Sequence, residues 1–211
     1  MEKILNVINL GLKDYQEVYN LQKEFVKKRY KGKIADTLIL TEHSPVFTIG
    51  RTGSIKNILA PLEELRKEGI DIYEIDRGGD ITYHGPGQIV GYPIIDLRGY
   101  QKDIHLYLRR LEEVLIQLLR NFGIEAIRIE RMSGVWVKNK KIASIGVGVS
   151  KWITYHGFCL NLNPNMSHFA MINPCGLGKP LTSMEEQLNG ELPQRREIEE
   201  KLVSYFKKVF S

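Results

Sequence analysis

The sequence of 211 residues predicts a globular protein that combines helices with strands. Two patterns support this fold class. Several short segments alternate apolar with polar residues, as half-buried strands do, and longer segments place apolar residues every three or four positions, as amphipathic helices do. No linker, low-complexity tract or repeat of solenoid length interrupts the chain. Its length therefore suits one large domain or two small ones.

The first half of the chain is predicted to alternate between strands and helices. Residues 4–10 form the first expected strand, which Gly11 ends, and residues 14–30 form an amphipathic helix. Pro61 begins a short helix that Gly69 closes, because proline favours the first helical turn. A short glycine-bearing loop is expected at 50–54, and further strands are expected at 36–41, 46–49, 70–75 and 89–95.

The second half is predicted to open with the longest helix and to continue mainly as strands. Asp103 is the expected N-cap of a helix over 103–122, and Gly123 is its stop. After Pro164 the chain becomes irregular, before a short helix at 183–188 and a final helix at 195–210. Strands are expected at 124–129, 134–137, 142–149 and 152–162, with Asn139 and Lys140 as a tight turn between the second and third of them.

The stretch from Arg77 to Asp96 is the part around which the chain is organised. Between the strands at 70–75 and 89–95 it holds four glycines and Pro86, and glycine lets a ligand approach the backbone without a Cβ in the way. A hairpin needs only about two to five loop residues. We therefore interpret this long loop as a binding loop, with polar side chains supplied by Arg77, Thr82, Tyr83, His84 and Gln88.

The composition excludes several classes of protein. A net charge of +5 favours acidic partners but is well short of a nucleic-acid-binding footprint. No apolar run approaches the roughly 18 residues that cross a membrane, and the first residues do not form a signal peptide. We expect a cytoplasmic protein without nucleic-acid or membrane partners. Its two cysteines, Cys159 and Cys175, are then expected to remain free thiols.

A basic cluster near the end of the first helix allows two interpretations. It is either a solvated helix terminus, whose cations suit the negative end of the helix dipole, or a docking patch for an acidic carrier protein. The sequence does not decide between them. The cluster consists of Lys27, Lys28, Arg29, Lys31 and Lys33.

Cys175 is the candidate nucleophile. It lies between Asn173-Pro174 and Gly176, in a loop where a sharp turn can present the sulfur, although a cysteine is often only a small buried apolar residue. Cys159 alternates within a strand and is expected to be such a buried residue. Because only the thiolate attacks, a reactive cysteine needs a neighbouring cation or base.

Lys141 is the candidate for that neighbour. Lys140 and Lys141 precede the strongly apolar segment 142–149, and one of two adjacent residues on a strand must point inward. Lys141 is the better placed of the two. The alternative interpretation is that both are solvated surface charges, as most lysines are.

Other functional classes lack their motifs. Five histidines and two cysteines show no paired metal-ligand spacing, so we expect no metal site. Gly85-Pro86-Gly87 lacks the lysine and the helix that follow a phosphate-binding loop, and no Gly-x-Ser-x-Gly elbow is present.

Four motifs in a fixed order carry a resemblance to a known family. The chain is similar over almost its whole length to the lipoyl(octanoyl) transferases, and the 34 residues from Lys141 to Cys175 match that family's usual spacing. The resemblance implies a single α+β domain of the biotin and lipoate ligase type over residues 1–211, with a mixed sheet flanked by helices. The four motifs are Arg77 to Gln88, Lys141 to Gly146, His156-Gly157-Phe158 and Asn173-Pro174-Cys175-Gly176.

The resemblance also assigns roles to residues. It implies that Cys175 forms the acyl thioester and that Lys141 lowers the pKa of its thiol. Arg77 could instead brace its loop by bonding carbonyls, and His84 and His156 could be hydrogen-bonded structural histidines. The segments implied to contact the acyl chain are Arg77, Gly78, Gly79, Asp80, Ile81, Thr82, Tyr83 and His84, then Ser144, Ile145 and Gly146, then His156, Gly157 and Phe158.

The implied activity moves octanoyl, or lipoyl, from acyl carrier protein to a lysine of lipoyl domains. The implied acceptors are the lipoyl domains of 2-oxoacid dehydrogenase complexes and the glycine cleavage H protein, and no cofactor or ATP is expected. Two alternatives remain open. An ATP-dependent lipoate or biotin ligase would activate a free acid without the cysteine, and a non-catalytic carrier-binding module would keep only the pocket.

Overall fold

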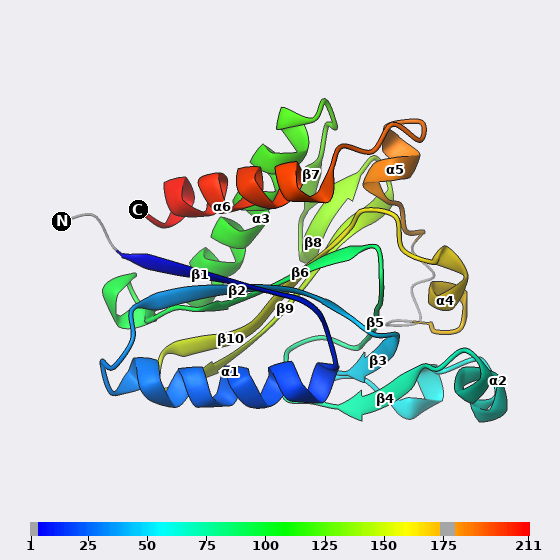
Figure 1. Ribbon diagram of the computed structural model, residues 1–211, viewed down its shortest axis with the longest axis horizontal. Helices are drawn as coiled ribbons and strands as arrows, with labels where there is room; N and C mark the ends of the chain where they lie inside the picture. Colours follow the sequence, from blue (N-terminus) through cyan, green and yellow to red (C-terminus); the bar gives the residue numbers. More distant parts are fainter. Residues whose placement is uncertain (1–3, 174–179) are drawn as a thin grey trace.

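The computed structural model describes residues 4–173 and 180–211, and its centre is a seven-stranded mixed sheet (Figure 1). The strands lie in the order β1-β2-β6-β10-β9-β8-β7; β1 and β2 are parallel and the other neighbours are antiparallel. The strands of this sheet are β1 (Leu5–Lys13), β2 (Asp36–His43), β6 (Gln88–Ile94), β7 (Ile127–Ile129), β8 (Met132–Val137), β9 (Lys140–Ser150) and β10 (Ile153–Asn161).

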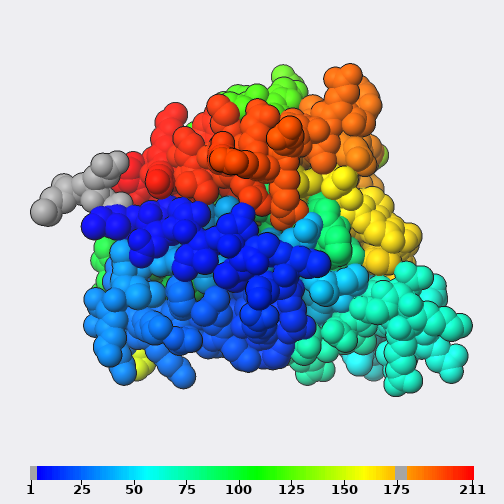
Figure 2. Space-filling model, viewed as in Figure 1, coloured from blue at the N-terminus to red at the C-terminus, as the bar shows by residue number. Residues whose placement is uncertain are grey.

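A separate three-stranded sheet lies beside the large one. Its order is β4-β3-β5, and its strands are β3 (Val46–Ile49), β4 (Asp71–Glu74) and β5 (Ile81–His84). Together with the short helix α2 (Leu62–Lys67) it forms a projecting corner of the molecule, coloured cyan in Figure 2. The chain reaches this sheet directly from β2, because only Ser44 and Pro45 separate β2 from β3.

Helices cover both faces of the large sheet. Helix α1 (Tyr15–Tyr30) packs on one face, against β6 and β10, and α3 (Ile104–Asn121) with α6 (Arg195–Phe210) covers the other (Figure 1). Asp14 and Asp103 cap α1 and α3 by accepting from the N–H groups of Glu17 and Leu106. Short elements complete the fold: the 3₁₀ helices η1 (Ile55–Asn57) and η2 (Leu97–Gly99), α4 (Met166–Ala170) and α5 (Met184–Gln187).

Three apolar cores match these layers. The largest lies between the sheet and α3 with α6, and includes Leu115 and Phe206, which are fully buried. A second lies under α1, where Val18 meets the sheet, and a third lies within the small sheet around Phe47. The pattern of apolar positions thus explains why each helix presents one face to the protein.

The predicted mixed α and β fold is confirmed, with three corrections. The loop predicted from Arg77 to Gln88 is wrong in its second half, because residues 81–84 form β5 and pair with β3. The expected mixed sheet is present, and a smaller second sheet lies beside it. The tight turn lies at residues 138–139, one position earlier than predicted, and α4 was not predicted at all.

The basic cluster at the end of α1 is partly structural. Arg29 forms ion pairs with Asp36 and Asp96, both of which are buried. Lys28 pairs with Glu24 one turn earlier in the helix. In the part of the chain that the structure describes, no helix is long and apolar enough to cross a bilayer.

Close packing between β6 and β10 gives the first testable prediction. Gly91 pairs with Phe158, and a Cβ on Gly91 would lie under 3.0 Å from the Phe158 ring. We expect Gly91→Ala to lower the free energy of unfolding by roughly 1–3 kcal/mol, the usual cost of overpacking a core. Gly99→Ala is the matched control, since a Cβ there meets nothing within 4 Å. Urea unfolding checks both; equal stability of the two variants would contradict the packing argument.

Candidate active site

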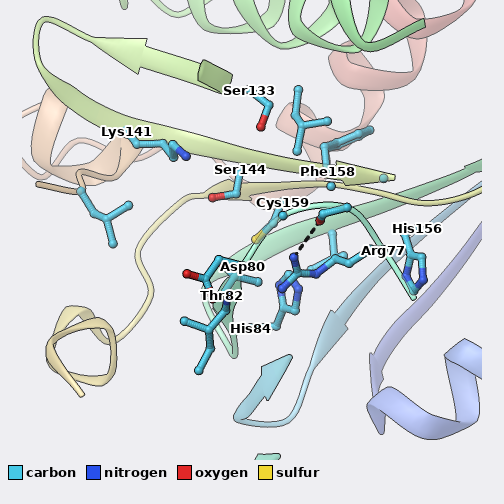
Figure 3. A pocket seen from close by; sticks show the side chains of 18 of the residues that line it. Arg77, Asp80, Thr82, His84, Ser133, Lys141, Ser144, His156, Phe158 and Cys159 are labelled. Atoms are coloured by element: carbon cyan, nitrogen blue, oxygen red, sulfur yellow. Dashed lines mark hydrogen bonds between the residues drawn. The ribbon is translucent and has the colours of Figure 1, made fainter. Parts of the chain in front are cut away.

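A cavity of about 450 Å³ lies between the small sheet and the large one, within the size range of small-molecule sites (Figure 3). The loop from Arg77 to Asp80 and strand β5 form one wall. Strands β6, β8, β9 and β10 form the opposite wall, and Phe169, Ile172, Asn173 and Leu181 close one side. Segments that are distant in sequence therefore meet at one place.

Arg77 fastens the first wall. Its side chain is buried and donates to the carbonyl oxygen of Thr48 at 2.6 Å and to that of Gly78 at 3.0 Å. The Gly78 N–H donates to the Val147 oxygen on β9 at 2.9 Å. Arg77 thus braces its own loop by bonding carbonyls, and the loop joins β3 of the small sheet to β9 of the large one.

The second wall comes from the pairing of β9 with β10. The register places Ser144 opposite Cys159, Ile145 opposite Phe158, and Gly146 opposite Gly157. The two segments that sequence similarity singled out are therefore cross-strand neighbours. Gly146 is required by close approach, because a Cβ there would lie 2.9 Å from the Gly78 oxygen and 3.1 Å from the Arg77 side chain.

The two adjacent lysines at the start of β9 point in different directions. Lys141 lines the cavity, whereas Lys140 forms an ion pair with Glu186 at 2.6 Å on the outside. This agrees with the prediction that Lys141 is the inward-facing lysine. The Lys141 backbone is held on its outer edge as well: its N–H donates to the Pro180 oxygen, and its own oxygen accepts from Thr182.

Asp76 organises the end of the cavity opposite Lys141. Its carboxylate accepts hydrogen bonds from the hydroxyls of Tyr19 and Tyr155 and from the Lys23 ammonium, and it lies 2.9 Å from Nε2 of His156. These donors, His156 first among them, hold the pKa of Asp76 well below its usual range. Figure 3 shows His156 and Lys141 on opposite sides of the cavity.

The histidines around the cavity are buried and neutral. Burial lowers the pKa of His84 well below its ordinary value, and the neighbouring His43 and Arg77 lower it further. Burial also lowers the pKa of His156, in spite of the nearby Asp76. For His43, burial lowers the pKa to about 4. A negatively charged substrate would therefore find its counter-charge in Arg77, Arg131 or Lys141 and not in these rings.

Known proteins are similar to this chain over almost its whole length. The family model described as the lipoyl protein ligase A/B catalytic domain matches residues 14–207. A curated protein named octanoyltransferase from Caldicellulosiruptor bescii is 49% identical over 98% of this chain and 91% of its own length. Another of the same name, from Desulforamulus reducens, is 41% identical over 98% of this chain and 91% of its own length.

The chain belongs to the lipoyl protein ligase A/B catalytic-domain family. The resemblance noted in the sequence is thereby confirmed.

Solved structures of lipoate and biotin protein ligases share the fold. A lipoate protein ligase from Thermoplasma acidophilum superposes with a TM-score of 0.73 at 16% identity, covering 100% of this chain and 84% of that one. A biotin protein ligase from Aquifex aeolicus superposes with a TM-score of 0.55 at 14% identity, covering 98% and 69%. Identities this low support the fold alone, and the fold is the biotin and lipoate ligase type that was predicted.

Every described residue that was predicted for the site lines the cavity of this family member, apart from Tyr83. The Tyr83 side chain packs instead with Phe47 and Phe169, and its hydroxyl lies 2.8 Å from Nδ1 of His168. Asp80 lines the cavity, yet its carboxylate accepts from the Asn57 amide at 2.7 and 2.8 Å and from the Ile81 N–H. Cys175 lies outside the described residues.

Several residues of the site were not predicted. Ser133 and Trp136 on β8 line the cavity, as do Tyr15 and Tyr92. Trp136 could have been found from the hairpin that joins β8 to β9. A tight turn at 138–139 places Trp136 opposite Lys141 in the pairing of these strands. No pattern in the sequence marks Asp76, whose four partners come from helix α1 and strand β10.

Cys159 behaves as predicted for a buried apolar residue. It is a free thiol with 4% of its surface exposed, and burial raises its pKa far above the ordinary value. Although it lines the cavity, its sulfur stays protonated and unreactive at neutral pH. Among the residues that the structure describes, no group of three or more histidine, cysteine or carboxylate side chains is gathered so as to hold a metal ion.

The buried neutral histidines predict that stability falls in mild acid. A folded-state pKa near 4 for His43, against 6.5 when unfolded, means that the unfolded chain binds the proton first. Neutral His43 makes its full contribution to the free energy of unfolding above pH 6.5, and roughly 3 kcal/mol of that contribution is lost by pH 4. Urea unfolding between about pH 7.5 and 4.5 should show this slope, and His43→Gln should reduce it. The exposed His105→Asn control should leave it unchanged; an identical slope in His43→Gln would refute the assignment.

The Asp76 carboxylate gives a further prediction. The amide introduced by Asp76→Asn would keep one acceptor but turn an N–H₂ group toward donors, so this variant should lower the free energy of unfolding by roughly 1–2 kcal/mol at neutral pH. Thermal and urea unfolding measure the change. Glu74→Gln, a neutralisation at an exposed position on the same segment, is the control and should change stability by less than about 0.5 kcal/mol. Equal effects would mean that the Asp76 network contributes nothing.

Proposed function

We propose that this protein transfers an octanoyl group from acyl carrier protein to a lysine of a lipoyl domain, through a thioester on Cys175. The observation that carries the proposal is the similarity to curated proteins named octanoyltransferase, at 41–49% identity over nearly the whole chain. The family model is described only as the catalytic domain of lipoyl protein ligase A/B. These relatives favour the transferase.

The cavity supports a role for Cys175 together with Lys141. The described residues that flank positions 174–179 include Asn173 and Leu181, and both line the same cavity as Lys141. Asn173 donates to the Asn57 oxygen, and the Pro180 oxygen accepts from the Lys141 N–H. The described residues on both sides of the segment that contains Cys175 are therefore anchored beside this cavity, which supports pairing Cys175 with Lys141.

In the first half-reaction the Cys175 thiolate attacks the carbonyl carbon of the octanoyl thioester on the carrier. The new carbon–sulfur bond forms as the bond to the carrier sulfur breaks, and the carrier leaves as a thiol after taking a proton. One thioester replaces another, so the step needs no ATP. An ammonium on Lys141 favours the thiolate, because an opposite charge nearby stabilises the ionised form.

In the second half-reaction the amine of the acceptor lysine attacks the Cys175 thioester. The amide bond forms, the sulfur of Cys175 leaves, and the proton lost by the amine is taken up by neutral Lys141 or by the leaving sulfur. Both half-reactions use the same cysteine and lysine. The kinetics should therefore be of the ping-pong type.

The apolar part of the cavity suits the hydrocarbon chain. Ile145, Phe158 and Val90 line it, and burying six methylenes at about 0.8 kcal/mol each would contribute up to roughly 5 kcal/mol to acyl binding. We propose that the acyl chain lies along β9 and β10, below the loop that begins at Arg77. The proposed acceptors are lipoyl domains of 2-oxoacid dehydrogenase complexes and the glycine cleavage H protein.

The covalent intermediate can be trapped. After incubation with octanoyl carrier protein, intact-mass spectrometry should find one octanoyl group on the protein, and peptide mapping should find it on Cys175 and not on Cys159. Hydroxylamine should remove the adduct. A folded, carrier-binding sample that carries no adduct would overturn the proposal, and so would full activity of Cys175→Ala with an absolute requirement for ATP, which would indicate a ligase.

Lys141 and its neighbour provide a matched pair of variants. Lys141→Ala should slow acylation of Cys175 on the order of 100-fold at neutral pH, and part of the rate should return at higher pH, where the thiol ionises unaided. Lys140→Ala, which only loses an external ion pair with Glu186, should acylate at nearly the wild-type rate. Single-turnover acylation followed by mass spectrometry measures both rates. Equal rates for the two variants would contradict the role of Lys141.

A further inference from the structure

An aromatic ring faces the ammonium group of Lys141. Strands β8 and β9 pair so that Trp136 lies opposite Lys141, and Nζ of Lys141 lies 4.8 Å from the centroid of the indole. A cation within about 6 Å of an aromatic centroid is attracted to the ring, and tryptophan is the strongest of the aromatic partners. The indole is 2% exposed, so water screens this attraction little.

The strand that carries Trp136 also makes room for the lysine stem. A Cβ on Gly134 would lie 3.4 Å from Cε and 3.6 Å from Cδ of Lys141, and Gly134 has a φ of 112°, which side chains rarely adopt. The Gly134 N–H donates to Oε1 of Glu112, a buried residue of α3. The hydrogen bond to α3 thus holds the β8 backbone in place where the aliphatic part of the Lys141 side chain passes Gly134.

The indole is kept at this position in spite of a cost. Its Nε1 is buried and has no hydrogen-bond partner among the residues that the structure describes. A phenylalanine or methionine of similar bulk would fill this place without burying an N–H donor. Tryptophan differs from both in the stronger attraction of its ring for a cation.

We propose that Trp136 is a positioning residue that holds the Lys141 ammonium at the cavity wall for its work on Cys175. This inference rests on the proposed function, because it assigns Trp136 a task only if Lys141 activates the thiol. Trp136 also lines the cavity and could simply contact the acyl chain. The two roles differ in the free enzyme, where no acyl chain is present.

The test measures the reactivity of the Cys175 thiol without an acyl substrate. Iodoacetamide alkylates the thiolate with loss of iodide, and peptide mass spectrometry separates Cys175 from the buried Cys159. Trp136→Met fills the space without a ring and should slow alkylation roughly three- to tenfold, whereas Trp136→Phe keeps a weaker ring and should slow it less. In Lys141→Ala, Trp136→Met should have no further effect, because the ring would then have no ammonium to hold.

A second measurement keeps an indole ring at position 136 and changes only its attraction for a cation. The chain has two tryptophans, Trp136 and Trp152. In Trp152→Phe, Trp136 is the single remaining tryptophan. Biosynthetic incorporation of mono-, di- and then tetrafluorotryptophan into this variant weakens, step by step, the attraction of the ring for a cation. Alkylation of Cys175 should slow with each step, and the same series in Trp136→Phe should be flat.

The outcomes separate this inference from the proposed function. If wild-type enzyme forms the octanoyl adduct and Lys141→Ala slows alkylation, but neither fluorination nor Trp136→Met does, only the role of Trp136 is overturned. If Lys141→Ala alkylates at the wild-type rate, the pairing of Lys141 with Cys175 fails and the inference fails with it.

Discussion

A buried arginine joins the two sheets, and the cavity depends on that junction. Arg77 donates to the Thr48 carbonyl in the small sheet, while the next peptide group donates to Val147 in the large one. Without these bonds the loop would lose its anchors on both sides and leave buried carbonyls unpaired, which costs more than the bonds contribute when made. A positive charge is tolerated inside because carbonyl dipoles and the Thr48 hydroxyl surround it. The loop first interpreted as a binding loop is therefore, above all, a connection that holds two layers apart at a fixed separation.

The same junction explains the absence of side chains at the point of contact. Gly146 on β9 lies directly under the loop, where a Cβ would meet both the Gly78 oxygen and the Arg77 side chain. On the neighbouring strand Gly157 pairs with Gly146 but is required by a different contact, because a Cβ there would lie under 3.0 Å from the Gly91 oxygen. Ile145 and Phe158, one position away, belong to the main core on the other face of the sheet, although they also line the cavity.

Local patterns predicted much of the fold, and the exceptions have physical reasons. The long helix near 103–122 carries its own cap and stop, so its position could be predicted from neighbouring residues alone. Strand β5 could not, because Ile81–His84 lies between glycines that suggest a loop, and it becomes a strand only by pairing with β3 more than thirty residues earlier. Lys141 was found from strand alternation, but Asp76 depends on four donors from distant elements. Local sequence patterns therefore did not predict the contacts between distant segments.

The distribution of charge explains how a thiol can line this cavity and remain inert. Cys159 lies on β10 in the apolar core under α1, where burial raises the pKa of its thiol and outweighs the opposing effect of Arg195. The lysine of β9 approaches the cavity at the other end, beside the described residues that flank the segment containing Cys175. Figure 3 shows Cys159 beside Ser144, between Lys141 and Arg77. A thiol gains reactivity from a nearby cation and not from exposure to the cavity alone. The apolar end of the cavity can therefore bind the hydrocarbon, while the proposed chemistry is confined to the end at Lys141.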